Sequence, residues 1–346
     1  MSELELPGDI HVALSHAAAY GLAAILEASG APGVTISWPS SLNSRAVVSA
    51  PGGDPDGIAA TVLHHARAHA ASESWTAATV GVPGGIAGRL SPRIKQPADD
   101  DGWLELARLR RQTIDEETGA RHWLDVRMIG ALGEPAYWRF DDQGKRRPDE
   151  GASRWEMKTR NAGEDFVRHR LHKLAQSVAA RDVAGVRPGL LGVSTTDEAG
   201  GNAIESRTGT GLTSLGPVDN ALAWCALWGL SRLPVVARTG RQSESAGYGT
   251  VRRTGAPRQT WLHLPVPRIA MTLAGLGTVI VSEQLGVVAS SSAQPVDTGE
   301  LGARSAREWL VARGVGAVVR FPIGVFGSAS APERRALLGS IVRLAP

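Results

Sequence analysis

Apolar and polar residues alternate along this chain in blocks that predict helices and strands in mixed order. In residues 11–29 the apolar positions recur at helical spacing, and Gly30 ends the block. Residues 34–38 and 45–50 contain the short apolar runs that are typical of paired strands. A second helix is expected over residues 54–73, where a proline follows an aspartate at the start.

The remaining elements continue this alternation to the end of the chain. Strands are expected at 75–82, 122–132, 136–140, 154–160, 189–196, 233–237, 260–266 and 317–326. Helices are expected at 103–115, 163–182, 221–230, near 269–276 and near 332–339. Asp219 and Asn220 can cap the apolar helix at 221–230. This mixture of expected helices and strands predicts an α+β fold of mixed sheets with packed helices. No internal repeat of fixed period is present.

Two polar stretches interrupt the pattern. Residues 141–153, DDQGKRRPDEGAS, have the composition of a linker. They separate an expected N-terminal α+β domain (1–145) from an expected C-terminal α+β domain (154–346). Residues 238–259 contain Gly, Ser and Arg with almost no apolar anchor, which predicts a mobile loop or a long hairpin. With 346 residues, the chain has room for one large domain or two closely packed domains.

The composition narrows the class of protein. With 42% hydrophobic and 21% charged residues, the chain is neither disordered nor collagen-like nor a coiled coil. The single cysteine, Cys225, excludes an intrachain disulfide and a multi-cysteine zinc site. The polar N-terminus does not resemble a signal peptide, and the longest apolar run is about half of the ~20 residues that a membrane helix needs. A cytoplasmic protein without membrane contact is expected.

Positive charge is concentrated in two stretches of the second half. Residues 145–187 carry eleven basic and six acidic side chains, and residues 232–268 carry seven arginines and one glutamate, although the formal net charge of the chain is only +3. Almost all basic residues are arginines, whose donors match phosphate and whose plane stacks on bases. A GC-rich genome explains the arginine total equally well. A basic stripe on an otherwise acidic body is nevertheless typical of polyanion binding.

Aromatic side chains are interleaved with these basic residues. Such a combination can follow a sugar-phosphate backbone and stack on bases, and a loose basic loop can become ordered on a strand. Tyr248 is the candidate wedge or stacking residue in the mobile loop. The candidate nucleic-acid contacts are Arg154, Lys158, Arg160, Asn161, Arg168, Arg170, Lys173, Arg207, Arg238, Arg241, Tyr248, Arg252, Arg253 and Arg258. The alternative interpretation is a solvated charged helix face beside an unrelated loop.

Three histidines lie close together on the second expected helix. His65, His69 and Glu73 are spaced so that one helix face presents all three, and His64 precedes them. Paired histidines at this spacing can bind zinc, but no glutamate stands beside the first one, and exposed histidines on a short helix are common. No metal ligand, cofactor or catalytic residue is therefore assigned.

Other motifs are weaker still. Residues 209–211 resemble part of a glycine-rich phosphate loop with Arg207 beside it, but the lysine and hydroxyl ending of a P-loop is missing. The acidic run at 99–101 is more typical of a helix cap than of a magnesium site. Cys225 lies in an apolar helix and has the character of a small buried hydrophobe.

Three longer stretches resemble a known family. They are SHAAAYGLAAILEASG (15–30), SRTGTGLTSLGPVDNALAWCALWGLSRLPV (206–235) and GVGAVVRFPIGVFGSASAPERRALLG (314–339). They resemble the divergent large-type or accessory subunits of type I CRISPR effector complexes, of the I-G (formerly I-U) subtype. The resemblance implies a subunit without catalysis of its own in an RNA-guided antiviral assembly, where a separate helicase-nuclease cuts. Such a subunit would contact guide RNA, target DNA or both, and help to recognise the motif beside the target.

The sequence thus leads to one main hypothesis and two alternatives. The main hypothesis is a nucleic-acid-binding, non-catalytic subunit whose partners are guide RNA, target DNA and other subunits of the effector complex. The first alternative is a hydrolase or transferase that holds a phosphorylated substrate at residues 209–211 and uses a histidine as general base. The second is a scaffold that binds only proteins. Gel shift with nucleic acid, nucleotide or metal content, and co-expression with neighbours discriminate among them.

Overall fold

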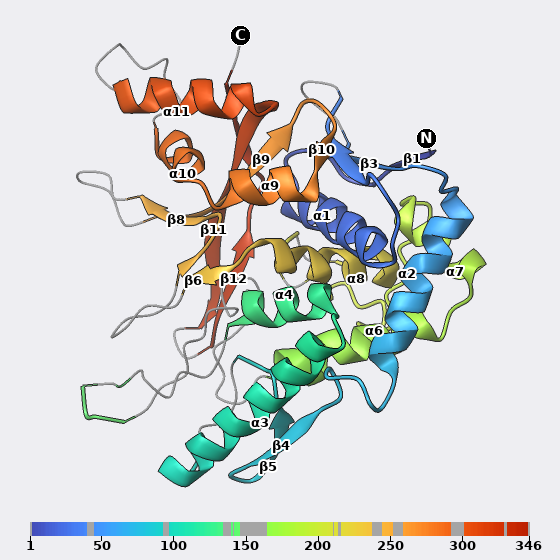
Figure 1. Ribbon diagram of the computed structural model, residues 1–346, viewed down its shortest axis with the longest axis vertical. Helices are drawn as coiled ribbons and strands as arrows, with labels where there is room; N and C mark the ends of the chain where they lie inside the picture. Colours follow the sequence, from blue (N-terminus) through green and yellow to red (C-terminus); the bar gives the residue numbers. More distant parts are fainter. Residues whose placement is uncertain are drawn as a thin grey trace.

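A small-residue contact between two apolar helices occupies the centre of the molecule (Figure 1). Helix α1 (Ala13–Ala28) is buried from its first residue to Leu26, and every residue of α8 (Asn220–Gly229) is buried. A Cβ atom at Gly21 would lie 1.7 Å from the carbonyl oxygen of Cys225. Because only glycine fits there, the two helix backbones approach each other far more closely than larger side chains allow.

This computed structural model describes residues 2–39, 45–92, 97–133, 140, 142–145, 165–209, 211–213, 216–236, 244–251, 259–291, 301–328 and 331–344. Within these ranges the fold is mixed α+β with antiparallel sheets, as the sequence predicts. The strands expected at 154–160 and 136–140 lie outside the described residues, except for Phe140.

The first sheet joins the first fifty residues to a strand from the second half of the chain. Its order is β1 (Ser2–Glu5), β3 (Val47–Ala50), β2 (Thr35–Ser37) and β10 (Met271–Thr272), and all neighbours are antiparallel. The expected pairing of the strands near 34–38 and 45–50 is confirmed, with Ile36 opposite Val48. The strand β10 comes from the second half of the sequence and completes the sheet.

The second sheet is built on two long strands, β9 (Gln259–Pro267) and β11 (Val315–Ser328). Its order is β12 (Ala331–Ala336), β11, β9 and β8 (Tyr248–Val251), and β13 (Ser340–Arg343) pairs with the first part of β11. Helices α9 (Leu273–Ile280), α10 (Glu283–Ser290) and α11 (Leu301–Ala312) pack on this sheet. Two-residue strands β6 (Val235–Val236) and β7 (Glu244–Ser245) form a separate pair.

A helical layer lies beside the α1–α8 pair (Figure 1). Helix α2 (Pro55–Ala70) packs against α6 (Lys173–Ala179) and α7 (Val183–Leu190). A π-helical segment, η1 (Val167–His172), leads into α6, and the 3₁₀ turn η2 (Leu230–Arg232) follows α8. Helices α3 (Asp100–Gly119) and α4 (Trp123–Leu132) complete the layer, and the hairpin β4 (Thr79–Val82) and β5 (Gly85–Gly88) packs on α3 through Trp103.

Three element types differ from the sequence prediction. The strand expected at 122–132 is helix α4, since Leu124, Met128 and Leu132 recur at helical spacing and are buried. The strand expected at 189–196 is the end of α7 followed by a turn at Gly192, where φ is +71°. The helix expected near 332–339 is strand β12, because its backbone groups pair with the exposed edge of β11, and this pairing overrides its local helix propensity.

One hydrophobic core crosses the expected domain boundary. The cluster that begins at Leu4 and contains α1 continues through α8 and β9 to Val342. Residues of both expected domains therefore contribute to a single core. Of the expected mobile loop at 238–259, the described residues form strands: β7 pairs with β6, and β8 pairs with β9. Residues 238–243 and 252–258 of this segment lie outside the described residues.

In the described part of the chain, no single helix combines the length and apolar character needed to cross a membrane. Helices α9 and α10 have the necessary length and apolar composition only when taken together, and this pair is bent by 59°.

Two buried histidines predict a loss of stability in acid. The side chain of His16 stacks on Trp38 and lies 2.8 Å from the carbonyl oxygen of Ile10, and burial lowers its pKa to about 4. Burial also lowers the pKa of His263 to about 4. In the unfolded chain both imidazoles have the ordinary pKa of 6.5, so the unfolded state takes up protons first as the pH falls.

We therefore expect these two histidines to leave the free energy of unfolding unchanged above pH 6.5 and to lower it between pH 6.5 and 4. Each histidine contributes up to about 3 kcal/mol to that decrease. Urea unfolding at a series of pH values measures it. The variant His16→Gln keeps a donor toward Ile10 but cannot titrate, so its curve should fall less steeply. Parallel curves for the variant and the parent would contradict the assignment to His16.

Candidate functional sites

The described residues include only part of the expected nucleic-acid interface. Outside them lie Arg154, Lys158, Arg160, Asn161, Arg238, Arg241, Arg252, Arg253 and Arg258. The structure places Arg168, Arg170 and Lys173 on η1 and α6, Arg207 in the loop before α8, and Tyr248 at the start of β8. Tyr248 is half-buried and packs against the main core. Five of the fourteen expected nucleic-acid contacts thus lie within the described residues.

The side chain of Arg168 makes contacts within the protein. Its Nη1 donates to the carbonyl oxygen of Ile86 at 3.1 Å and lies 4.0 Å from Oδ2 of Asp165. Asp165 is buried and also accepts a hydrogen bond from the backbone N–H of Gly88. These contacts attach η1 to the β4–β5 hairpin. Arg168 is one of the expected nucleic-acid contacts, and in the structure its guanidinium bonds the chain itself.

The next turn of the same segment lines a basic cavity. His169, Arg170 and Lys173 border a hollow of about 180 Å³, together with Thr208 from the loop before α8. Leu174 and Leu227 supply its apolar part. His169 and Lys173 are exposed, and Arg170 is half-buried. Two of the expected nucleic-acid contacts, Arg170 and Lys173, therefore lie next to Thr208 in this cavity. Arg207, which precedes Thr208 in the sequence, is another expected contact.

The glycine loop at 209–211 is a structural junction. The N–H of Leu14 donates to the carbonyl oxygen of Leu212 at 2.9 Å, which ties the start of α1 to this loop. The N–H of Ala336 donates to the carbonyl oxygen of Gly211 at 2.8 Å, which ties β12 to it. Gly209 is buried, and a Cβ there would lie 3.2 Å from Thr213. Close packing at Gly209 and a φ of +75° at Gly211 therefore account for these glycines as part of the fold.

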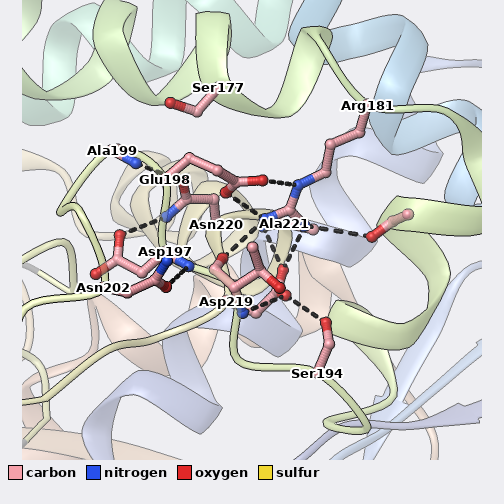
Figure 2. A network of polar contacts seen from close by, with 12 residues as sticks. Ser177, Arg181, Ser194, Asp197, Glu198, Ala199, Asn202, Asp219, Asn220 and Ala221 are labelled. Carbon is pink, nitrogen blue, oxygen red and sulfur yellow. Dashed lines mark hydrogen bonds and ion pairs between the residues drawn. The ribbon is translucent and has the colours of Figure 1, made fainter.

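A buried polar network surrounds the start of α8 (Figure 2). Asp197 is fully buried and accepts hydrogen bonds from Ser206, from Thr208 at 2.6 Å and from the amide of Asn220 at 2.7 Å. Asp219 caps α8 through the N–H of Ala221 and pairs with Arg181, each at 2.9 Å. Both carboxylates accept several donors from the chain itself. The network is therefore architectural.

Two other sequence motifs have structural roles. Asp99 caps α3, where its side chain accepts from the N–H of Gly102 at 2.9 Å, as expected. Cys225 is buried against α1, and burial raises the pKa of its thiol. A thiol held in its neutral form away from solvent is unreactive.

The three histidines of α2 are held by different contacts. Nδ1 of His65 accepts a hydrogen bond from Trp224 at 3.1 Å, and its ring lies 4.5 Å from that of Trp228. His69 contacts the carbonyl oxygen of His65 through Nδ1 and Oδ1 of Asp125 through Nε2, at 2.8 and 2.7 Å. His64 is exposed. Since both ring nitrogens of His69 are engaged, the ligand face with His65 and Glu73 is not assembled.

These histidines instead border a larger pocket. It has a volume of about 740 Å³ and lies between the end of α1, α2 and the junction of α3 with α4. Glu117, His122 and Asp125 line it, and each offers one ligand atom within 4.8 Å of the other two. The sequence prediction missed this group because a strand at 122–132 would point His122 and Asp125 to opposite faces. The helical spacing of Leu124 and Met128 was the signal that could have revealed it.

The chain matches no protein-family model, no curated protein and no solved structure.

Proposed function

We propose that the protein is a nucleic-acid-binding subunit, without catalysis of its own, of an RNA-guided CRISPR effector complex. The basic cavity between η1, α6 and the loop before α8 carries the proposal. It gathers His169, Arg170 and Lys173 where the sequence has its first excess of positive charge. The resemblance of residues 15–30, 206–235 and 314–339 to large-type or accessory subunits supports the choice of complex. Guide RNA, target DNA or both are the proposed ligands.

The cavity suits a phosphate of a nucleic-acid backbone. Its volume of about 180 Å³ corresponds to about six water molecules in the liquid, which is enough for one phosphate group and part of its hydration shell. Cationic side chains and a hydroxyl are the groups that most often contact phosphate oxygens. Such contacts fix the position of the strand and carry no base preference, which agrees with a subunit in which base pairing reads the sequence.

An exposed apolar strip supports membership of an assembly. Val325 and Phe326 on β11 and Leu337 and Leu338 after β12 are all more than 40% exposed. A Cβ built at Gly324 would lie 2.7 Å from Phe326 and 3.3 Å from Leu337, so these two side chains share one face of the sheet, while Val325 points to the other face. Clustered exposed apolar residues mark protein–protein contacts. We propose the face that carries Phe326 and Leu337 as the docking face for a neighbouring subunit.

Substitution of Lys173 tests the basic cavity. Lys173→Ala is expected to weaken binding of single-stranded RNA and duplex DNA about tenfold at low salt. It should also reduce the slope of log K against log salt concentration by about one, since one phosphate contact is lost. Filter binding or fluorescence anisotropy across a salt series measures both values.

Arg304→Ala is the matched control. Arg304 is 79% exposed on α11 and pairs with Glu308, away from the cavity, so its loss should leave the affinity unchanged. Equal affinity and equal salt slope for Lys173→Ala and the parent protein would refute the site. Absence of any nucleic-acid binding, combined with a stable complex with co-expressed neighbours, would favour the protein-only scaffold.

A further inference from the structure

The junction of α3 and α4 brings three potential metal ligands together. Glu117 lies in the last turn of α3, His122 immediately precedes α4, and Asp125 lies in the first turn of α4. The N–H of His122 donates to the carbonyl oxygen of Glu117 at 3.0 Å, so the chain folds back on itself here. Between them Arg121 has a φ of +61°, an uncommon conformation for a residue other than glycine.

The three side chains offer one nitrogen and two carboxylate oxygens. Nδ1 of His122 lies 2.8 Å from Oε2 of Glu117, and ligand atoms of all three residues lie within 4.8 Å of one another. Ligand atoms around a tetrahedral zinc ion are roughly 3.3 Å apart, given metal–ligand distances of about 2.0–2.1 Å. The observed spacing therefore requires only small side-chain movements to enclose an ion. Glu117 and Asp125 have side chains only 18% and 14% exposed.

A second layer of hydrogen bonds holds Asp125 in place. Nε2 of His69 and Nε1 of Trp75 both reach Oδ1, at 2.7 and 2.6 Å. Within the described residues Oδ2 accepts no hydrogen bond. Carboxylate ligands that are oriented through one oxygen in this way are typical of protein metal sites.

The pocket beside these ligands contains a further polar group that lacks a partner. Because Nδ1 of His65 accepts from Trp224, the neutral ring carries its proton on Nε2. This Nε2 is buried and has no hydrogen-bond partner in the described part of the chain. A buried donor without an acceptor costs about 1–3 kcal/mol.

We infer that Glu117, His122 and Asp125 bind a divalent zinc-type cation, with the pocket of about 740 Å³ providing room for a water or anion at an open coordination position. The imidazole nitrogen favours zinc over magnesium, which prefers oxygen ligands only. Three protein ligands and one open position are the composition of zinc sites that bind an exchangeable molecule. His69 and Trp75 act through Asp125 as positioning residues.

Titration of the full-length protein with Zn²⁺ tests the inference without any nucleic acid, so its outcome is independent of the proposed function. We expect one zinc ion per chain by isothermal titration calorimetry and by elemental analysis after gel filtration. His122→Ala should lower the affinity at least about 100-fold, since a ligand is lost, whereas Trp75→Phe should lower it about 10-fold through Asp125.

His64→Ala is the control, because His64 lines the same pocket but does not belong to the ligand group. Its zinc affinity should equal that of the parent protein. Circular dichroism melting verifies that each variant is folded, and Glu117→Gln replaces His122→Ala if the latter does not fold. Failure of the parent protein to bind zinc, retention of zinc by the ligand variants, or equal loss in His64→Ala would overturn the inference.

Discussion

Replacing Gly21 by alanine should destabilise the protein by about 3 kcal/mol or more, because the added methyl group has no space between the two central helices. Its Cβ would lie 1.7 Å from the carbonyl oxygen of Cys225 and 2.5 Å from the backbone nitrogen of Gly229. Both atoms belong to the backbone of a buried helix, so α1 and α8 must move apart. Gly229 is restricted in the same way by the carbonyl oxygen of Ala17, at 2.0 Å.

Gly130→Ala is the matched control for Gly21→Ala. Gly130 lies in α4, is exposed, and has no atom within 4 Å of a Cβ built there. The same substitution should stabilise α4 by up to about 1 kcal/mol, since alanine loses less backbone entropy than glycine in a helix. Urea unfolding of both variants measures the difference. If Gly21→Ala proves as stable as Gly130→Ala, the close contact between α1 and α8 is not present in solution.

Asp219→Ala should cost about 2–3 kcal/mol, because several buried donors lose their acceptor, although Arg181 keeps Glu198 as an ion-pair partner. Asp219 accepts from Arg181 and Ala221 through Oδ1, and from Ser194 and Thr196 through Oδ2, as Figure 2 shows in part. A Cβ at Gly189 would lie 1.9 Å from Oδ1, so the surrounding backbone is closely fitted to this carboxylate.

Asp54→Ala provides the comparison, since Asp54 also caps a helix but is exposed. Its side chain accepts from the N–H of Gly57 at 2.6 Å, and loss of such a cap costs about 1 kcal/mol. Thermal or urea unfolding of the two variants separates capping from the buried network. Equal destabilisation by the two substitutions would mean that the contacts of Asp219 to Arg181, Ser194 and Thr196 add nothing beyond the cap.

Helices with clear periodicity and a strong cap could be predicted from the sequence. The expected helix at 11–29 is α1, and its end at Gly30 is confirmed by a φ of +90° there. The cap predicted at Asp219 is also confirmed. In these cases local conformation and burial favour the same structure, so no distant residue is needed to decide it.

Elements decided by distant pairing could not be predicted in the same way. Residues 332–339 have a proline and a glutamate where a helix would begin, yet β12 forms because β11 is long enough to pair with it. The apolar run near residue 190 was ambiguous for a different reason. Leu190 is buried while Val193 is 79% exposed, so only part of the run belongs to the core.

The candidate sites were predictable only in part. Charge density identified the segment that carries Arg170 and Lys173, because excess charge is visible without the fold. It did not identify the role of Arg168, which depends on the carbonyl oxygen of Ile86, far away in the sequence. The group of Glu117, His122 and Asp125 was missed because its geometry depends on whether residues 122–132 are a strand or a helix.

The contact between α1 and α8 has a consequence for how this protein is made in the cell. Translation completes α1 long before it reaches α8, and α1 has an apolar surface on all sides. The sheet that contains β1, β3 and β2 is likewise incomplete until β10 has been synthesised. During synthesis the emerging N-terminal half therefore lacks the partners that cover it, and such intermediates are prone to aggregate. We expect the central helix pair and the first sheet to form only after α8 and β10 have been synthesised.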